Sequence, residues 1–177
     1  MTQGGLHERC LDLLEPLQLP HRFGTGQLCA AVAKLRGRPL HLEPMEPAPP
    51  GVVVHGMLHE YSDKDVILYE PATSQLHQLH SIAHEIAHAL WDHPSDPALR
   101  ARAEADAQAQ GRDGSQILRV SGRTGYSPPH EYEAETLASL IRQRMYRDRL
   151  LPPPSPTNAA ERLEAAFTRP IRERRRR

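Results

Sequence analysis

The centre of the chain contains the segment LHSIAHEIAHAL, residues 79–90, in which apolar residues recur at helical spacing. This spacing predicts an α-helix that Thr73 or Ser74 caps and that ends at about Trp91. Its apolar face is broad, so we expect this helix to be more buried than most helices of a globular domain. The segment therefore predicts a core helix that also carries several polar side chains.

Two of those polar side chains, His84 and His88, are four residues apart, and Glu85 follows the first. Four residues advance an α-helix by about 400°, so the two imidazoles lie on one face, one turn apart. Both can reach one ion at about 2.0–2.1 Å, the zinc–nitrogen distance. Glu85 lies beside the ion, where a carboxylate takes a proton from metal-bound water and returns it to a leaving amine. The H-E-x-x-H pattern thus predicts a zinc hydrolase site.

The alternative interpretation is that His84 and His88 are hydrogen-bonded core histidines and that Glu85 is an exposed charge. Burying these three polar groups in a core helix is costly without a partner, which favours the metal site. His77 and His80 lie on the same side of the helix. One helix face presents only about two adjacent imidazoles to an ion, so we expect both at the rim or on the surface.

A zinc hydrolase site has three protein ligands and an open position for water, so a third ligand must come from elsewhere in the chain. His93, past the end of the helix, is a weak candidate. Stronger candidates lie at the start of a second helix, predicted for residues 130–148 after two prolines. Helical periodicity places Glu135 toward solvent and does not choose between Glu131 and Glu133. His130 belongs to the same cluster of candidates.

The N-terminal part of the chain predicts helices over residues 6–17 and 26–36, then strands at 39–44, 52–59 and 66–69. We expect an α+β domain over residues 1–150, with several helices packed on a small, three-stranded, mostly antiparallel sheet. Residues 92–126 are interpreted as a variable insertion with a solvated helix at 97–110. Residues 151–177 form a Pro/Arg-rich C-terminal extension that we expect to be partly disordered, with a short helix near 159–167.

The composition indicates one soluble domain with a tail. The chain has 177 residues, 38% of them hydrophobic, and its 22 basic and 22 acidic residues cancel. A zero net charge excludes a globally basic nucleic-acid-binding protein. No apolar run approaches the roughly 18–20 residues of a membrane span, and no signal-peptide pattern is present. Cys10 and Cys29 are too few for a disulfide framework, so we expect a cytoplasmic protein with reduced thiols in its core.

The segments HEIAH (84–88) and EAETLASLI (133–141) resemble the ImmA/IrrE family of metallopeptidases. The family pattern is H-E-[IL]-[AG]-H, followed later by E-A-x-x-[FL]-A. The resemblance spans residues 5–148 and implies a minimal zincin-like fold with one Zn²⁺ per chain. It implies that Glu133 is the third zinc ligand beside His84 and His88. The chain departs from the family in the 44 residues between His88 and Glu133 and in Glu135, where Asn or Asp is common.

The resemblance also implies a function. Family members act on regulatory proteins, often helix-turn-helix repressors, in stress responses and in phages or other mobile elements. The implied reaction is peptide-bond hydrolysis with Glu85 as the general base. His80, Tyr126, His130 and Tyr132 are further candidates to contact the transition state or the metal ligands. The strand Val66–Tyr69 is a candidate edge for pairing with an extended substrate.

Two other functions remain open from the sequence. The small size of the chain favours a zinc-containing regulatory binding module that does not cleave its partner. The C-terminal extension holds seven Arg and three Glu in residues 151–177, which favours a nucleic-acid-associated protein that binds through this tail. A protein substrate is the partner that the leading hypothesis requires, and nucleic acid is a partner only through the tail.

Overall fold

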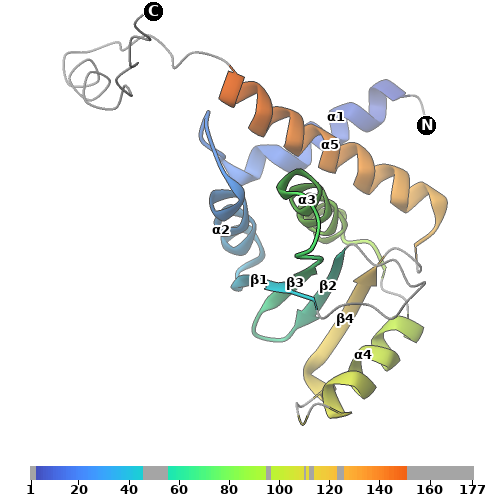
Figure 1. The fold of residues 1–177 in the computed structure, drawn as a ribbon. Helices are drawn as coiled ribbons and strands as arrows, with labels where there is room; N and C mark the ends of the chain where they lie inside the picture. Colours follow the sequence, from blue (N-terminus) through green and yellow to red (C-terminus); the bar gives the residue numbers. More distant parts are fainter. Residues whose placement is uncertain are drawn as a thin grey trace, which may run out of the picture.

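Helix α3, Gln75–Trp91, is the central helix of the structure, a computed structural model that describes residues 3–45, 56–94, 97–109, 111, 114–122 and 126–150. Every side chain from Ser81 to Ala89 is buried. The predicted cap is confirmed, since Ser74 Oγ accepts a hydrogen bond from the backbone N–H of His77 at 3.3 Å. Figure 1 shows α3 between the sheet on one side and α5 (Pro128–Leu150) on the other.

The described residues form an α+β fold, as predicted. The predicted helices and strands of the N-terminal part are present, although of the strand expected at 52–59 only residues 56–59 are described. The C-terminal extension, 151–177, lies outside the described residues. The other elements are α1 (Gln3–Leu14), η1 (Glu15–Leu17), α2 (Thr25–Arg36), β1 (Leu40–Pro44), β2 (Gly56–Tyr61), β3 (Asp65–Tyr69), α4 (Pro97–Ala109), η2 (Gly114–Gln116) and β4 (Ile117–Gly122).

The sheet has four strands in the order β1-β3-β2-β4. Strand β2 pairs antiparallel with β3 and with β4, and β1 pairs parallel with β3. The predicted three strands are therefore one too few, because β4 comes from the segment 92–126 that was interpreted as an insertion. The expectation that Val66–Tyr69 is an edge is wrong as well. Strand β3 lies between β1 and β2, and the edges are β1 and β4.

The main core lies where α3 packs against the sheet and against α5. It includes Leu58 and Ile67 from the sheet, Ile86 from α3 and Ile141 from α5, all fully buried. Each such side chain contributes about 1.5–3 kcal/mol through its burial, so this packing holds α3 and α5 in a fixed relation. Cys10 and Cys29 are buried free thiols in the same core, as predicted. A smaller cluster of Ala107, Ile117 and Val120 joins α4 to β4.

A network of buried ion pairs fastens α2 to the sheet and to the end of α3. Arg36 donates to Asp65 Oδ2 at 2.6 Å and to Glu60 Oε2 at 2.7 Å. Its Nη1 also donates to the carbonyl oxygen of Ala89 at 2.9 Å, in the last turn of α3. Arg38 pairs with the same two carboxylates at 2.7 Å. The two buried carboxylates are thus compensated, and the C-terminal turn of α3 is anchored.

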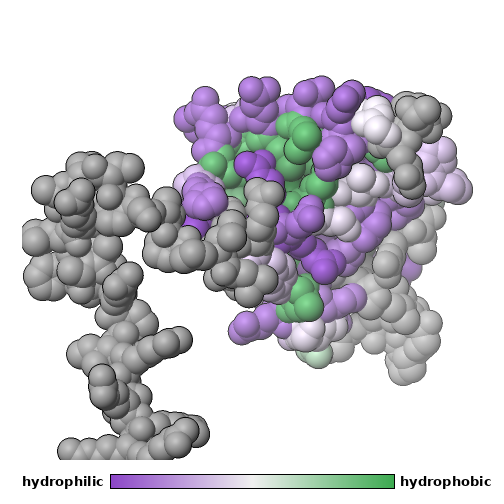
Figure 2. All heavy atoms as spheres, turned by 90° about the horizontal axis from the view of Figure 1, so that it is seen from above, coloured by the Kyte–Doolittle hydropathy of each residue, from purple (hydrophilic) through white to green (hydrophobic). Residues whose placement is uncertain are grey.

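No helix in the described part of the chain is both long enough and apolar enough to cross a membrane. Seen from above, the molecule shows a large apolar area with hydrophilic side chains around it and a smaller apolar area apart from it (Figure 2). Exposed large hydrophobic side chains are few among the described residues: Leu11, Leu35, Leu76, Leu118 and Tyr132.

Candidate metal centre

The two histidines of the motif lie one turn apart on the same face of α3. Their Nε2 atoms are 3.0 Å apart, and the residues are only 7% and 2% exposed for His84 and His88. Burying an imidazole costs free energy unless its ring nitrogens have polar partners or bind an ion. Two buried imidazoles side by side therefore favour a metal site. The i, i+4 spacing places both ring nitrogens at one point, as the sequence predicts.

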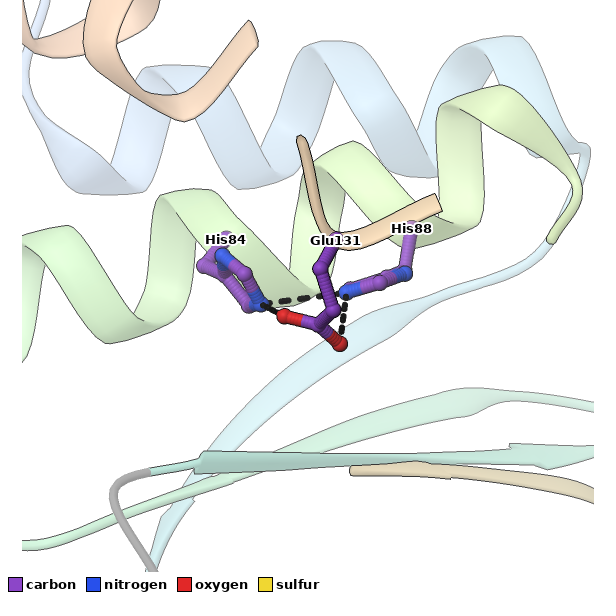
Figure 3. Close-up of side chains that lie close together, drawn as sticks. All are labelled: His84, His88 and Glu131. Carbon is purple, nitrogen blue, oxygen red and sulfur yellow. Dashed lines mark hydrogen bonds and ion pairs between the residues drawn. The ribbon is translucent and has the colours of Figure 1, made fainter. Parts of the chain in front are cut away.

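The third group at this point is the carboxylate of Glu131, which reaches over from the first turn of α5 (Figure 3). Its Oε2 lies 3.4 Å from Nε2 of His84, and its Oε1 lies 3.7 Å from Nε2 of His88. The ligand atoms of a tetrahedral zinc site lie about 3.3–3.6 Å apart, since each is about 2.0–2.2 Å from the ion. The observed distances of 3.0, 3.4 and 3.7 Å lie within about 0.3 Å of that range, so His84, His88 and Glu131 form a group that could hold a metal ion.

Glu133, which the family resemblance implies as the third ligand, is not brought to the His84–His88 pair. Its Oε2 lies 3.2 Å from Nε2 of His93, and its Oε1 lies 3.4 Å from Nη1 of Arg9. Two residues along a helix correspond to a rotation of about 200°, so Glu131 and Glu133 leave α5 on different sides. With His93 and His130, Glu133 forms a second group of metal-ligating side chains.

His93 lies next to the candidate metal centre, although its position after the helix made it a weak candidate. Asp92 ends α3 in the left-handed conformation, with φ 53° and ψ 41°. This turn brings the chain back, so that the backbone N–H of His93 donates to the carbonyl oxygen of His88 at 3.2 Å. The Nδ1 atoms of the two rings are then 2.9 Å apart. The signal in the sequence was weak, because Asp is only moderately favoured in this conformation.

Glu85 is 3% exposed and packs against the first residue of β2. A Cβ atom built on Gly56 would lie 3.2 Å from both Cγ and Oε1 of Glu85. The missing side chain of Gly56 therefore leaves the space that the Glu85 carboxyl group uses. The carboxylate is held in place by the sheet rather than extended into solvent, contrary to the interpretation of Glu85 as an exposed charge.

Burial disfavours the protonated forms of His88 and His93. The pKa of His88 is lowered from 6.5 to about 2, first by burial and then by the neighbouring imidazoles of His84, His93 and His130. Burial also lowers the pKa of His93, although its hydrogen bond with Glu133 opposes this effect. A neutral imidazole keeps a lone pair for a metal ion, so both shifts favour metal binding over protonation.

The remaining predicted residues surround this group. The Tyr126 ring stacks on the His88 ring at 3.7 Å with an interplanar angle of 10°, and His130 stacks on His93 at 4.5 Å. Nδ1 of His80 lies 2.9 Å from Nη1 of Arg142, and its Nε2 lies 3.2 Å from Oε2 of Glu135. Glu135 is exposed, as predicted, and so is Tyr132 at 53%. Tyr126 is thus in direct contact with a candidate ligand, whereas His80 belongs to the rim.

In comparisons with known proteins, no family model, no curated protein and no solved structure matches this chain. The evidence for a metal site therefore comes from the geometry of these side chains.

Proposed function

We propose that this protein is a zinc-dependent endopeptidase in which His84, His88 and Glu131 hold the ion and Glu85 is the general base. The observation that carries the proposal is the convergence of two buried imidazole nitrogens, 3.0 Å apart, with the carboxylate of Glu131. Its Oε2 lies 3.4 Å from His84 and its Oε1 lies 3.7 Å from His88. Two imidazoles and one carboxylate are a ligand set typical of catalytic zinc sites, which keep a further position open for water. The side chain of Glu131 is 28% exposed, so solvent reaches this group from one side.

When bound, the zinc ion supplies a Lewis acid that polarises the scissile carbonyl and activates water. The chain supplies the proton transfers. Glu85 takes the proton of the attacking water and delivers it to the leaving amine, and its close contact with Gly56 restricts the movement of the carboxylate. Tyr126 covers one face of His88 and excludes water from it.

We infer a regulatory protein, such as a helix-turn-helix repressor, as the substrate. The support is the resemblance of HEIAH (84–88) and EAETLASLI (133–141) to the ImmA/IrrE family. A cytoplasmic location is part of the same proposal, because two cysteines, both free and buried, fit a compartment that keeps thiols reduced.

The test combines metal analysis with a cleavage assay. Elemental analysis of untagged protein is expected to find about one zinc per chain. The zinc-loaded protein is then incubated with the candidate repressor, and the products are analysed by mass spectrometry. We expect discrete fragments from the wild type and none from Glu85→Gln, which keeps its zinc. Equal cleavage by Glu85→Gln would contradict the assigned base.

The same assay separates the peptidase from a binding module that does not cleave. Tight binding of the repressor by wild type and by Glu85→Gln, with no fragments from either, would replace the peptidase with a zinc-containing binding module. Absence of stoichiometric metal after reconstitution with zinc would reject both.

A further inference from the structure

A chain of close polar contacts runs from His88 away from the proposed metal position. Nδ1 of His88 lies 2.9 Å from Nδ1 of His93, and Nε2 of His93 lies 3.2 Å from Oε2 of Glu133. Oε1 of Glu133 lies 3.4 Å from Nη1 of Arg9. His88 and His93 are 2% and 4% exposed, and the side chain of Glu133 is 12% exposed. The His88–His93 and His93–Glu133 contacts are therefore shielded from water, which strengthens them, whereas the side chain of Arg9 is 48% exposed and its contact with Glu133 is open to solvent.

When His93 is neutral, as the lowering of its pKa by burial favours, the hydrogen-bonding groups permit one arrangement of protons along this chain. The carboxylate of Glu133 only accepts, so Nε2 of His93 carries the hydrogen that it receives. A neutral His93 then has a lone pair on Nδ1, and Nδ1 of His88 must be the donor across the 2.9 Å contact. A neutral His88 that carries its hydrogen on Nδ1 has its lone pair on Nε2. That atom is the one that faces His84 and Glu131.

We propose that His93 and Glu133 are positioning residues that fix the tautomer and ring orientation of His88, so that its Nε2 is permanently available to the metal ion. The inference rests on the proposed metal centre and assigns a role to the second group of side chains. Metal-ligating histidines donate their other N–H to a carboxylate, carbonyl or water, and loss of such a partner costs about 10–100-fold in metal affinity. Here a histidine is inserted between the ligand and the carboxylate.

A second metal site is the competing assignment, since His93, His130 and Glu133 have ligand atoms within 4.8 Å of one another. The two rings, however, stack with centroids 4.5 Å apart and an interplanar angle of 27°. The lone pairs of an imidazole lie in the plane of its ring, so stacked rings direct them side by side rather than toward one ion. The geometry therefore favours a hydrogen-bonded relay.

Variants at position 93 test the relay through metal affinity. In His93→Phe the ring that stacks on Trp91 and His130 remains, but the acceptor for His88 is lost. We expect the zinc affinity, measured by competition with a chelator, to fall about 10–100-fold. His93→Asn places an oxygen near the former Nδ1 and should recover part of the loss. His77→Phe, on the same helix but outside the relay, is the matched control and should keep wild-type affinity.

Spectroscopy provides a readout that a merely structural role would not change. The visible absorption of the Co²⁺-substituted protein should change in His93→Phe and stay as in the wild type in His77→Phe. In ¹⁵N-labelled, zinc-loaded wild type, the histidine ring spectra should show the hydrogen of His88 on Nδ1 and that of His93 on Nε2. This measurement needs no variant, so misfolding of a variant cannot obscure it.

Three results would overturn the relay. One is wild-type affinity in His93→Phe with an unchanged Co²⁺ spectrum, which leaves the metal centre intact. Another is a metal content of two ions per chain that falls to one in His130→Phe. That result would make His93, His130 and Glu133 a second metal site. The third is a wild type that binds no zinc, which rejects the metal centre itself and the relay with it.

Discussion

Glu85 packs so closely against Gly56 that a Cβ atom at position 56 would lie 3.2 Å from its Cγ and Oε1. We predict that Gly56→Ala displaces the carboxylate by a few tenths of an ångström. A misplacement of about 1 Å costs about 100-fold in rate, so this smaller shift should lower kcat about tenfold. Zinc content should not change, because Glu85 is not one of the three proposed ligands and the atoms nearest to the new Cβ belong to Glu85 and Leu68. Peptidase kinetics and elemental analysis of the same sample measure both effects.

The matched control is Gly26→Ala. A Cβ atom there meets nothing within 4 Å, and Gly26 lies in helix α2, where alanine is the better residue. This variant should keep wild-type kcat and gain slightly in stability. Wild-type kcat in Gly56→Ala would show that the Gly56 contact does not position the base.

The two glutamates of α5 should respond differently to substitution. Glu131→Ala removes a donor atom 3.4 Å from Nε2 of His84, so we expect the protein to lose its zinc on dialysis. Glu133→Gln keeps an amide oxygen that accepts from His93, so the loss of affinity should not exceed the roughly 100-fold seen for outer partners. Retention of zinc in Glu131→Ala together with complete loss in Glu133→Ala would restore the assignment that the family resemblance implies.

This pair of glutamates shows where sequence-based prediction of the site stops. Helical periodicity places Glu133 about 75° to one side of the centre of the apolar face of α5 and Glu131 about 85° to the other side. Which flank meets His84 and His88 depends on how α5 crosses α3, and that is a tertiary property. The position of His93 likewise depends on the left-handed turn at Asp92. The i, i+4 histidines needed only the geometry of one helix, and so the sequence alone placed them.

The elements of the fold likewise fall into those that local sequence signals predict and those that depend on tertiary pairing. Helix α3 was predictable because its apolar face and its Ser74 cap are local signals. Strand β4 was not, because Ile117–Gly122 lies between glycines, beyond a polar helix, and becomes a strand by pairing with β2. The internal place of β3 follows from its parallel pairing with β1, which no local pattern indicates.

The ion network around Asp65 should contribute strongly to stability where α2 meets the sheet. Asp65 is 1% exposed and pairs with Arg36 and Arg38. Asp65→Ala leaves both guanidinium groups without one of their buried partners, so we expect the free energy of unfolding to fall by about 3–5 kcal/mol. Urea denaturation measures this change. The control Glu104→Gln breaks the exposed pair with Arg100 and should cost less than about 1 kcal/mol; a similar loss in both would contradict the network.

The metal-free protein should lose stability in mild acid because of His88. Its pKa falls from 6.5 in the unfolded chain to about 2 in the fold, mainly through burial. Below pH 6.5 the unfolded state binds a proton that the folded state does not, so unfolding is favoured as the pH falls toward 2. The stabilisation is complete above pH 6.5, and the free energy of unfolding declines by up to about 1.4 kcal/mol per pH unit below it.

Urea denaturation of chelator-treated protein between about pH 7 and pH 5 measures the slope before most carboxylates titrate. His88→Gln removes this titration and should show a shallower slope; equal slopes in the two proteins would show that His88 is not kept neutral by the fold.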